Sequence, residues 1–438
     1  MARPSTSKVR TLEPDHRQVS FVIDDPDRTL PPDHVARALY VIVGTLDLSG
    51  FTRDSKAVEH HAGRPVLSPR SLLTLWLYAI TLGIGSAREI ERFTRSDDAF
   101  RWLIRGFEVS HHALSAFRVG HGAVLEQLMA DVLGILVQKQ LVCLELVAQD
   151  GTRVRADASA PSFRRLASLL ECREQALLHI KAVLAQADGS PSDGAREAKA
   201  RDYLARVDEA IATVKELQAK LPPVPATPPA EAKPAEAKPA SSAKKPADPK
   251  KPKEPRASTT DPDARNMKMG DGGFRPGYNF QLAVAGKETG GPRTITAFRV
   301  TNVGSDMGSI EPMLKQTVMN TGLFPQIELA DANHAKHSCI QYAADVGVAV
   351  LMTVPVREEQ SQKVVSLGVA AWKRRMASEE GKRLYRARPG LVELVNAQFK
   401  ERFGLTRVRV RGLANVTCVG LLACLAFNIT QHAAALLR

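Results

Sequence analysis

Three stretches decide the fold: CLELVAQD (Cys143–Asp150), YNFQLAVAG (Tyr278–Gly286) and RTITAFRVTN (Arg293–Asn302). Each alternates or runs apolar over a strand's length, and a turn rich in Gly and Pro joins the last two, which predicts a β-hairpin. The rest of the pattern alternates: helix 306–319, strand 326–331, helix 336–346, strand 348–355 and helix 390–402. This order predicts a mixed α/β core that is interrupted after its first strand.

Two segments of different composition fill the interruption. Residues 161–221 are rich in Ala, Glu, Lys and Arg and carry leucines at roughly helical spacing, which predicts an antiparallel helical pair. Residues 222–256 hold 11 of the 27 prolines and no aromatic residue. Proline at this density blocks helix and sheet hydrogen bonds, so we expect a disordered, solvated Pro/Ala/Lys tether. It is an inert spacer or, through its lysines, an auxiliary DNA contact.

The region before the first strand is expected to be helical. After a tail over residues 1–29, residues 30–140 contain Ser68-Pro69, an N-cap followed by proline at the first helical position, and then the apolar run LLTLWLYAITLGI. Short helices, polar turns and scattered arginines indicate a helix-turn-helix-like DNA-binding region, with a plain helical bundle as the alternative.

Composition limits the partners. The 438 residues exceed one typical domain, and 60 Lys+Arg against 47 Asp+Glu leave a net charge of +13, which favours a polyanion such as nucleic acid or an acidic membrane face. The apolar runs fall short of the ~18 residues of a membrane span, and the N-terminus lacks a secretory apolar region. The five cysteines form no CxxC pair and are expected to be reduced.

Two aspartates follow alternating strands. Asp150 shares one side of its strand with Leu144, Leu146 and Ala148, and Asp331 is expected to end a strand in the same way. If the two strands pair, the carboxylates emerge close together and repel one another unless a cation lies between them. Oxygen ligands suit Mg²⁺, and two such ions ~4 Å apart support phosphoryl transfer. An isolated Asp is more often a turn residue or a helix cap.

A third acid lies on the helix that contains LVELVNAQFK. Val392, Val395 and Phe399 form one apolar stripe at 100° per residue, whereas Glu393 and Lys400 lie almost in line on another side. The helix can therefore pack on the sheet and present an acid and a base to the cleft; the alternative is an ordinary solvated face.

Several motifs together resemble a known family. The spacing Y-x2-R-x4-E-x6-K, formed by Tyr385, Arg388, Glu393 and Lys400, resembles the last motif of bacterial insertion-sequence DDE transposases. The stretch AQDGTRVRADAS resembles the first-Asp motif, and STTDPDARNMKMGDGGFRPGYNFQLAV resembles the family's stretch T-D-P-D-A-R–…–G-Y-N-x-Q-x-A-V. TNVGSDMGSIEPML with ADANHAK resembles the run into the second Asp. GRPVLSPRSLLTLWLYAITLGIGSAREIERFTRSDDAFRWLIRG resembles the N-terminal helical region of the same family.

The resemblance implies a ribonuclease H-like catalytic core, with its first strand in residues 141–160 and the remainder in 257–438. It implies that Asp150, Asp331 and Glu393 are catalytic and bind Mg²⁺, with Mn²⁺ as a substitute. Tyr385, Arg388 and Lys400 are expected to contact the DNA backbone. The partners would be double-stranded DNA, both terminal inverted repeats and target, and a second copy in a homodimer. A cytoplasmic, nucleoid-associated bacterial protein with no membrane partner is implied.

The sequence departs from the family beside two of the acids. Leu-Val-Asn-Ala follows Glu393, and Ala-Asn-His follows Asp331, where the family carries other residues. Two alternatives to a transposase therefore stay open: a ribonuclease H-fold nuclease without strand transfer and a catalytically inactive DNA-binding regulator. Asp157 is expected to be a support or turn residue, Asp306 a helix cap and His334 a surface or supporting residue.

Overall fold

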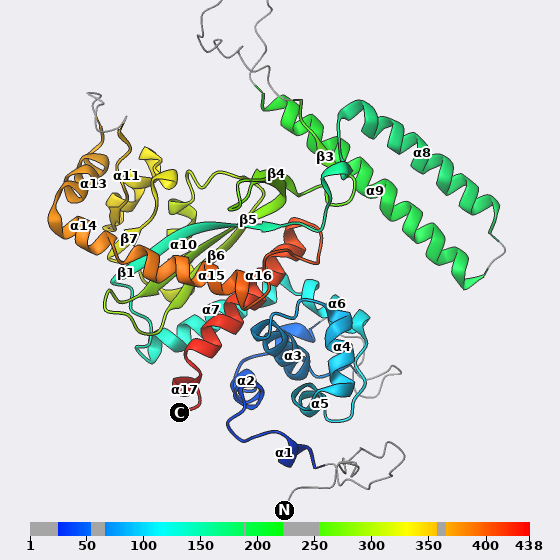
Figure 1. Cartoon of the computed structure of the whole chain (residues 1–438), viewed down its shortest axis with the longest axis horizontal. Helices are drawn as coiled ribbons and strands as arrows, with labels where there is room; N and C mark the ends of the chain where they lie inside the picture. Colours follow the sequence, from blue (N-terminus) through cyan, green and yellow to red (C-terminus); the bar gives the residue numbers. More distant parts are fainter. Residues whose placement is uncertain (1–24, 54–65, 188–189, 222–253, 357–364) are drawn as a thin grey trace, which may run out of the picture.

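The structure is a computed structural model that describes residues 25–53, 66–187, 190–221, 254–356 and 365–438. It is a mixed α/β protein in which a helical N-terminal region packs beside a curled mixed sheet (Figure 1). Almost all of the expected tether, residues 222–253, and most of the N-terminal tail lie outside the described residues.

The N-terminal region contains α1 (Pro26–Thr29), α2 (Val35–Val43), α3 (Pro69–Thr81), α4 (Ala87–Ser96), α5 (Asp98–Ile104), α6 (His111–Val119) and α7 (Gly122–Gln138). The sheet contains β1 (Leu146–Arg155), β4 (Arg265–Lys268), β5 (Phe274–Gly286), β6 (Thr294–Thr301), β7 (Ile327–Leu329) and β8 (Ala349–Leu351), while β2 (Phe163–Arg164) pairs with β3 (Ala257–Ser258). The other helices are α8 (Leu166–Ala185), α9 (Pro191–Ala219), α10 (Ile310–Thr321), α11 (His337–Asp345), α13 (Leu367–Ala377), α14 (Glu379–Tyr385), α15 (Leu394–Glu401), α16 (Leu413–Gln431) and α17 (Ala433–Leu436).

β1 lies inside the sheet, with β5 antiparallel on one edge and β7 parallel on the other. The predicted hairpin is confirmed, because β5 and β6 pair antiparallel. The prediction that the first strand ends at Asp150 is wrong: β1 continues to Arg155, since the long β5 keeps its hydrogen-bond ladder with β1 throughout. Asp150 therefore lies within the strand, just beyond the short stretch that pairs with β7.

The two faces of the sheet are covered by different helices. Ala148 and Leu282 belong to the apolar core on the α16 side, whereas Val147 and Ala283 pack with Met313 of α10 on the other side. α16 lies between the sheet and the N-terminal helices, next to α3 and α7 (Figure 1). Apolar surface on one helix thus serves both halves of the molecule.

By length and composition α16 could cross a membrane, and the bent pair of α6 and α7 passes the same test if it is counted as one span. The apolar run Gly420–Ile429, which by itself falls short of a membrane span, is part of this longer helix. Most of α16 is buried, so its composition is that of a core helix.

The aspartates of the TDPD sequence fix the start of α16. The Asp261 carboxylate accepts hydrogen bonds from the Gly412 N–H at 3.1 Å and the Tyr278 hydroxyl at 2.7 Å, and Asp263 accepts one from the Leu413 N–H at 2.8 Å. Carboxylates at a helix N-terminus satisfy its free N–H groups and its positive dipole. This motif therefore has a structural role.

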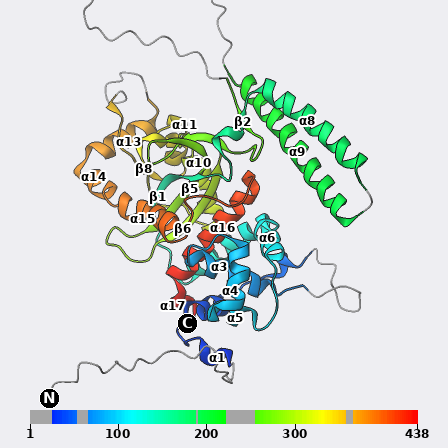
Figure 2. The same cartoon turned by 45° about the vertical axis from the view of Figure 1, so that its right-hand side comes forward.

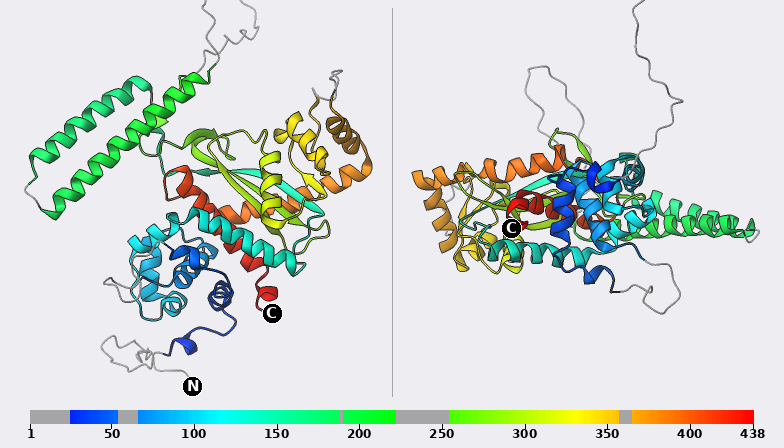
Figure 3. Two further views of the ribbon diagram at one scale, coloured as in Figure 1. Left: turned by 180° about the vertical axis from the view of Figure 1, so that it is seen from behind. Right: turned by 90° about the horizontal axis from the view of Figure 1, so that it is seen from below.

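α8 and α9 form a helical hairpin that projects from the sheet (Figure 2). The two helices pack along one another through Leu169, Val207 and Val214, and the view from below shows them extending away from the rest of the molecule (Figure 3). In the sequence the hairpin lies between β2 and β3, which pair with one another.

Behind Asp150, on the α10 face, lies a buried polar network. The Asp306 carboxylate accepts hydrogen bonds from Arg153 at 2.7 Å, Asn279 at 2.7 Å and Gln281 at 2.6 Å. The prediction that Asp306 caps a helix is therefore wrong. Its carboxylate is part of this network, and α10 begins later, after Ser309. Gly151 leaves room for this carboxylate, because a Cβ there would lie 2.2 Å from Asp306 Oδ1.

Gly151→Ala should lower the free energy of unfolding by roughly 2–4 kcal/mol, because the added methyl displaces a buried, fully bonded carboxylate. The matched control is Gly134→Ala in α7, where a Cβ meets nothing within 4 Å; it should be neutral or stabilise by about 0.5–1 kcal/mol. Urea unfolding of both variants measures this, and equal effects would contradict the network's role.

Candidate active site

Asp150 and Asp331 come from the parallel pair of β1 and β7. Ala148 lies opposite Leu329 in the register, so two residues further along each chain Asp150 and Asp331 come opposite one another on the same face. β7 has ended by then, and Asp331 caps a short 3₁₀ turn instead. Burial raises the pKa of Asp150, and the negative charge of Asp331 adds to this rise, as expected for neighbouring carboxylates.

Glu393 ends a π-helical turn, Pro389–Glu393, that leads directly into α15. The Leu394 N–H bonds back to the Pro389 carbonyl, five residues earlier. The sequence predicted one regular helix over 390–402, and its apolar stripe is indeed buried. The wide turn, however, changes the direction in which Glu393 projects, and such turns occur frequently at functional sites.

The guanidinium of Arg388 joins two of the acids. Its Nη2 lies 3.1 Å from Asp150 Oδ1, and its Nη1 lies 2.9 Å from Glu393 Oε1. The Arg388 side chain is only 10% exposed, whereas that of Glu393 is 53% exposed. The structure thus brings Asp150, Arg388 and Glu393 together around one positive charge.

Asn396 was not singled out by sequence reasoning. Its Nδ2 donates to Asp150 Oδ2 at 2.9 Å, and its Oδ1 is buried without a hydrogen-bond partner. Asn396 lies three residues after Glu393, on a neighbouring part of the same helix surface, and this spacing was the available signal. Both oxygens of Asp150 are therefore held by named side chains.

The His334 ring forms a hydrogen bond with the carboxylate of Asp331. Its Nδ1 lies 2.6 Å from Asp331 Oδ1, and the ring is fully buried, so a surface position is excluded. The Asn333 N–H and side-chain amide donate to the same carboxylate at 3.0 and 2.9 Å. The sequence Ala-Asn-His after Asp331, which departs from the family, thus orients the carboxylate.

The acids differ in their electrostatics. Burial raises the pKa of Asp150, and Arg388 opposes this only in part. Burial also acts to raise the pKa of Asp331, but the hydrogen bond from His334 and the nearby positive charges hold it below its usual value. Of the two aspartates, Asp150 would therefore gain more from an additional cation.

Lys400 and Tyr385 lie on either side of this cluster in the sequence. Burial lowers the pKa of Lys400, while the charge of Asp150 opposes that shift, which places the ammonium in the field of the same carboxylate. Tyr385 is half-buried and packs against the main apolar core. Arg388 thus contacts Asp150 and Glu393 directly, whereas Tyr385 contacts the apolar core by packing.

The side chains suit a hard divalent cation in chemical type, since three carboxylates and the orphaned Oδ1 of Asn396 are oxygen donors. Among the described residues, however, no three His, Cys, Asp or Glu side chains are grouped closely enough to hold a metal ion. Arg388 supplies the positive charge between Asp150 and Glu393. A cation between these two acids therefore requires Arg388 to release one of them.

Arg388→Met should lower the free energy of unfolding by about 3 kcal/mol or more, because it leaves the largely buried Asp150 without its cation. Asp150→Asn in the same chain should recover part of this loss, giving a coupling energy in a double-mutant cycle. The control is Arg383→Met, which breaks the exposed pair with Glu288 and should cost less than about 1 kcal/mol. Similar losses in both single variants, measured by urea unfolding, would contradict the assignment.

Two parts of the chain match transposase families. Residues 353–433, which contain Glu393 and α16, match the family described as transposase DDE domain, and residues 24–119 match the transposase domain family DUF772. No curated protein and no solved structure matches the chain. Transposases act on DNA. The two matched regions lie at opposite ends of the chain, and each is similar to a transposase family.

Proposed function

We propose that this chain is a DDE transposase that binds terminal inverted repeats and catalyses metal-dependent DNA cleavage and strand transfer. The observation that carries the proposal is that Arg388 contacts both Asp150 and Glu393. Asp150 and Asp331 each lie two residues beyond the last pair of the ladder between β1 and β7. Acids from a strand and from a distant helix converge where packing does not require charge. Bringing charges together in a partly buried place costs stability, and catalytic sites contain such charges more often than apolar cores do.

We propose further that the sheet is a ribonuclease H-like core. Its support is the strand order β6-β5-β1-β7-β8, in which β1, β5 and β6 are antiparallel and β1, β7 and β8 are parallel. This order agrees with the sequence of elements from which that core was predicted.

In this proposal Asp150, Asp331 and Glu393 hold Mg²⁺. Bound Mg²⁺ would acidify the attacking hydroxyl or water and stabilise charge in phosphoryl transfer. His334 and Asn333 keep Asp331 oriented, and Asn396 keeps Asp150 oriented, so the acids are positioned before any ligand arrives. Arg388, once released from the carboxylates, can form paired hydrogen bonds with a DNA phosphate, and Lys400 can meet one as a point charge.

One observation favours a second candidate, a catalytically inactive DNA-binding regulator. Arg388 neutralises Asp150 and Glu393 without any metal. If Arg388 never released these two carboxylates, the chain would keep a stable fold and its DNA contacts but would lack catalysis. A nuclease without strand transfer shares every described site residue and differs only in its product.

The deciding experiment is cleavage of duplexes taken from the DNA that flanks the coding sequence, with Mg²⁺ or Mn²⁺. Asp150→Asn should retain DNA affinity and abolish cleavage. Asp345→Asn, the same change at an exposed acid of α11, is the control and should cut normally. Lys400→Ala should weaken binding and reduce the salt slope by about one.

Normal cutting by Asp150→Asn would contradict the DDE mechanism. Binding without cutting by the unaltered chain would establish the regulator, and cut DNA that is never joined to a target would establish the nuclease.

A further inference from the structure

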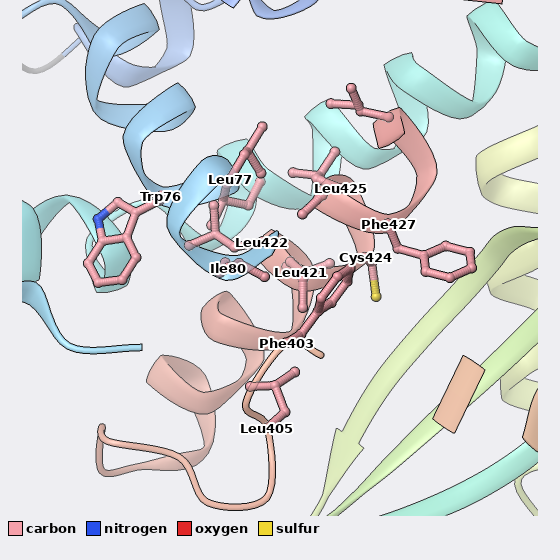
Figure 4. Packing of buried hydrophobic residues seen from close by; sticks show 14 of the residues in the cluster. Trp76, Leu77, Ile80, Phe403, Leu405, Leu421, Leu422, Cys424, Leu425 and Phe427 are labelled. Carbon is pink, nitrogen blue, oxygen red and sulfur yellow. The ribbon is translucent and has the colours of Figure 1, made fainter. Parts of the chain in front are cut away.

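A cavity of about 300 Å³ lies between the N-terminal helices and the segment after α15, away from the acids. Trp76 and Ile80 of α3 and Leu422 of α16 form part of its apolar wall (Figure 4). Much of the facing wall comes from Thr406–Arg411, TRVRVR, which we call the arginine strap. None of the sequence motifs discussed above includes this segment.

The arginine strap runs beside the end of β1. The Arg155 N–H donates to the Thr406 carbonyl at 3.1 Å, and the Val408 N–H donates to the Arg155 carbonyl at 2.8 Å. Val408 and Val410 are buried, and the three arginines between and around them are exposed. Alternation along an extended segment therefore places Arg407, Arg409 and Arg411 on the side opposite Val408 and Val410.

Two glycines hold the strap against the N-terminal helices. Gly83 and Gly404 both have positive φ, at +75° and +67°, and their backbones touch. A Cβ on Gly404 would lie 2.6 Å from the Gly83 carbonyl oxygen. The cavity is thus bounded by a close backbone contact that only glycine permits, and its shape is set before any ligand binds.

Arg118 of α6 is a buried cation in the wall of this cavity. It is 7% exposed, and its guanidinium donates to the Gly85 carbonyl at 2.8 Å and lies 4.7 Å from the ring centre of Trp76. Its Nε is buried without a hydrogen-bond partner. Burial, together with the positive charge of Arg409, lowers the pKa of Arg118 to about 10.

The acid that lines the cavity is already neutralised. Asp157 Oδ1 accepts from Arg407 and Asp157 Oδ2 accepts from Arg411, both at 3.0 Å. In the described part of the chain, no ion pair with a carboxylate is found for Arg118 or Arg409. Arg118 and Arg409 therefore both line the cavity, and a buried charge such as that of Arg118 is costly unless an anion joins it.

We propose that this cavity is a second DNA contact, in which Arg118 and Arg409 bind a phosphate of the DNA backbone. Guanidinium groups match phosphate oxygens in paired geometry, and the apolar wall strengthens the attraction by excluding water. Asp157 is seven residues from Asp150, so the cavity wall is at most about 25 Å from the acids along the chain. Duplex DNA covers that distance in about seven base pairs.

That the bound phosphate belongs to DNA rests on the proposed function, whereas the existence of an anion site does not. The experiment therefore tests the anion site and the binding of DNA in separate arms. The first arm is titration calorimetry of the full chain with inorganic phosphate. Arg409→Ala and Arg118→Lys should each weaken phosphate binding about tenfold or more. The control is Arg299→Ala, an exposed arginine on β6, which should bind as the unaltered chain does.

The second arm is a DNA titration at several salt concentrations. Arg409→Ala should reduce the salt slope by about one, and Arg299→Ala should leave it unchanged. Arg409 is exposed, so its variant should fold normally.

Phosphate binding that is unaffected by Arg409→Ala and Arg118→Lys would overturn the site. Phosphate binding that these variants abolish, together with an unchanged DNA salt slope, would overturn the assignment to DNA and leave free phosphate as the ligand. If the unaltered chain binds no DNA at all, the proposed function fails, and the phosphate arm still decides the anion site.

Discussion

The hydrogen-bond ladders on both edges of β1 hold the rest of the molecule in place. The antiparallel ladder with β5 runs the full length of β1, the parallel ladder with β7 covers only its first part, and the arginine strap joins the far end. Asp150 lies where the parallel partner stops. One strand therefore carries Asp150 near its middle and pairs at its end with the arginine strap, which lines the cavity proposed to bind an anion.

Charge compensation follows opposite patterns at these two places. Around Asp150, carboxylates outnumber the cation that joins them, and the one guanidinium is shared. Around Asp157, arginines outnumber the acid, and both carboxylate oxygens are taken. A polyanion with bound divalent cations would complement both places at once, the cations at the first and the phosphates at the second.

Alternation and register allowed much of this arrangement to be predicted from sequence. The hairpin and the shared side of Asp150 and Asp331 follow from the two-residue period of strands, and the buried stripe of α15 follows from helical spacing. The end of β1 was predicted wrongly, because strand length depends on the length of a partner far away in the chain.

Other features have no local signal in the sequence. The π turn before α15 depends on tertiary packing, and so does the bridge from Arg388 to Asp150, which joins residues over 200 positions apart. Asn396 and Arg118 read as ordinary helix residues until their neighbours are known. The roles of the six predicted site residues remain predictions.

The place of α16 has a consequence for synthesis of the chain. The N-terminal helices pack against α16, which the ribosome makes roughly 270 residues after α7 is finished. At translation rates of about 5–20 residues per second, the apolar surface of α3 and α7 stays without α16 for about 14–55 s. During that interval the N-terminal region would be open to chaperones and proteases. Limited proteolysis should therefore cut this region faster in chains that end before Leu413 than in full-length chains, which contain all of α16. Folding of the region expected to read DNA is thus tied to completion of the domain expected to cut it.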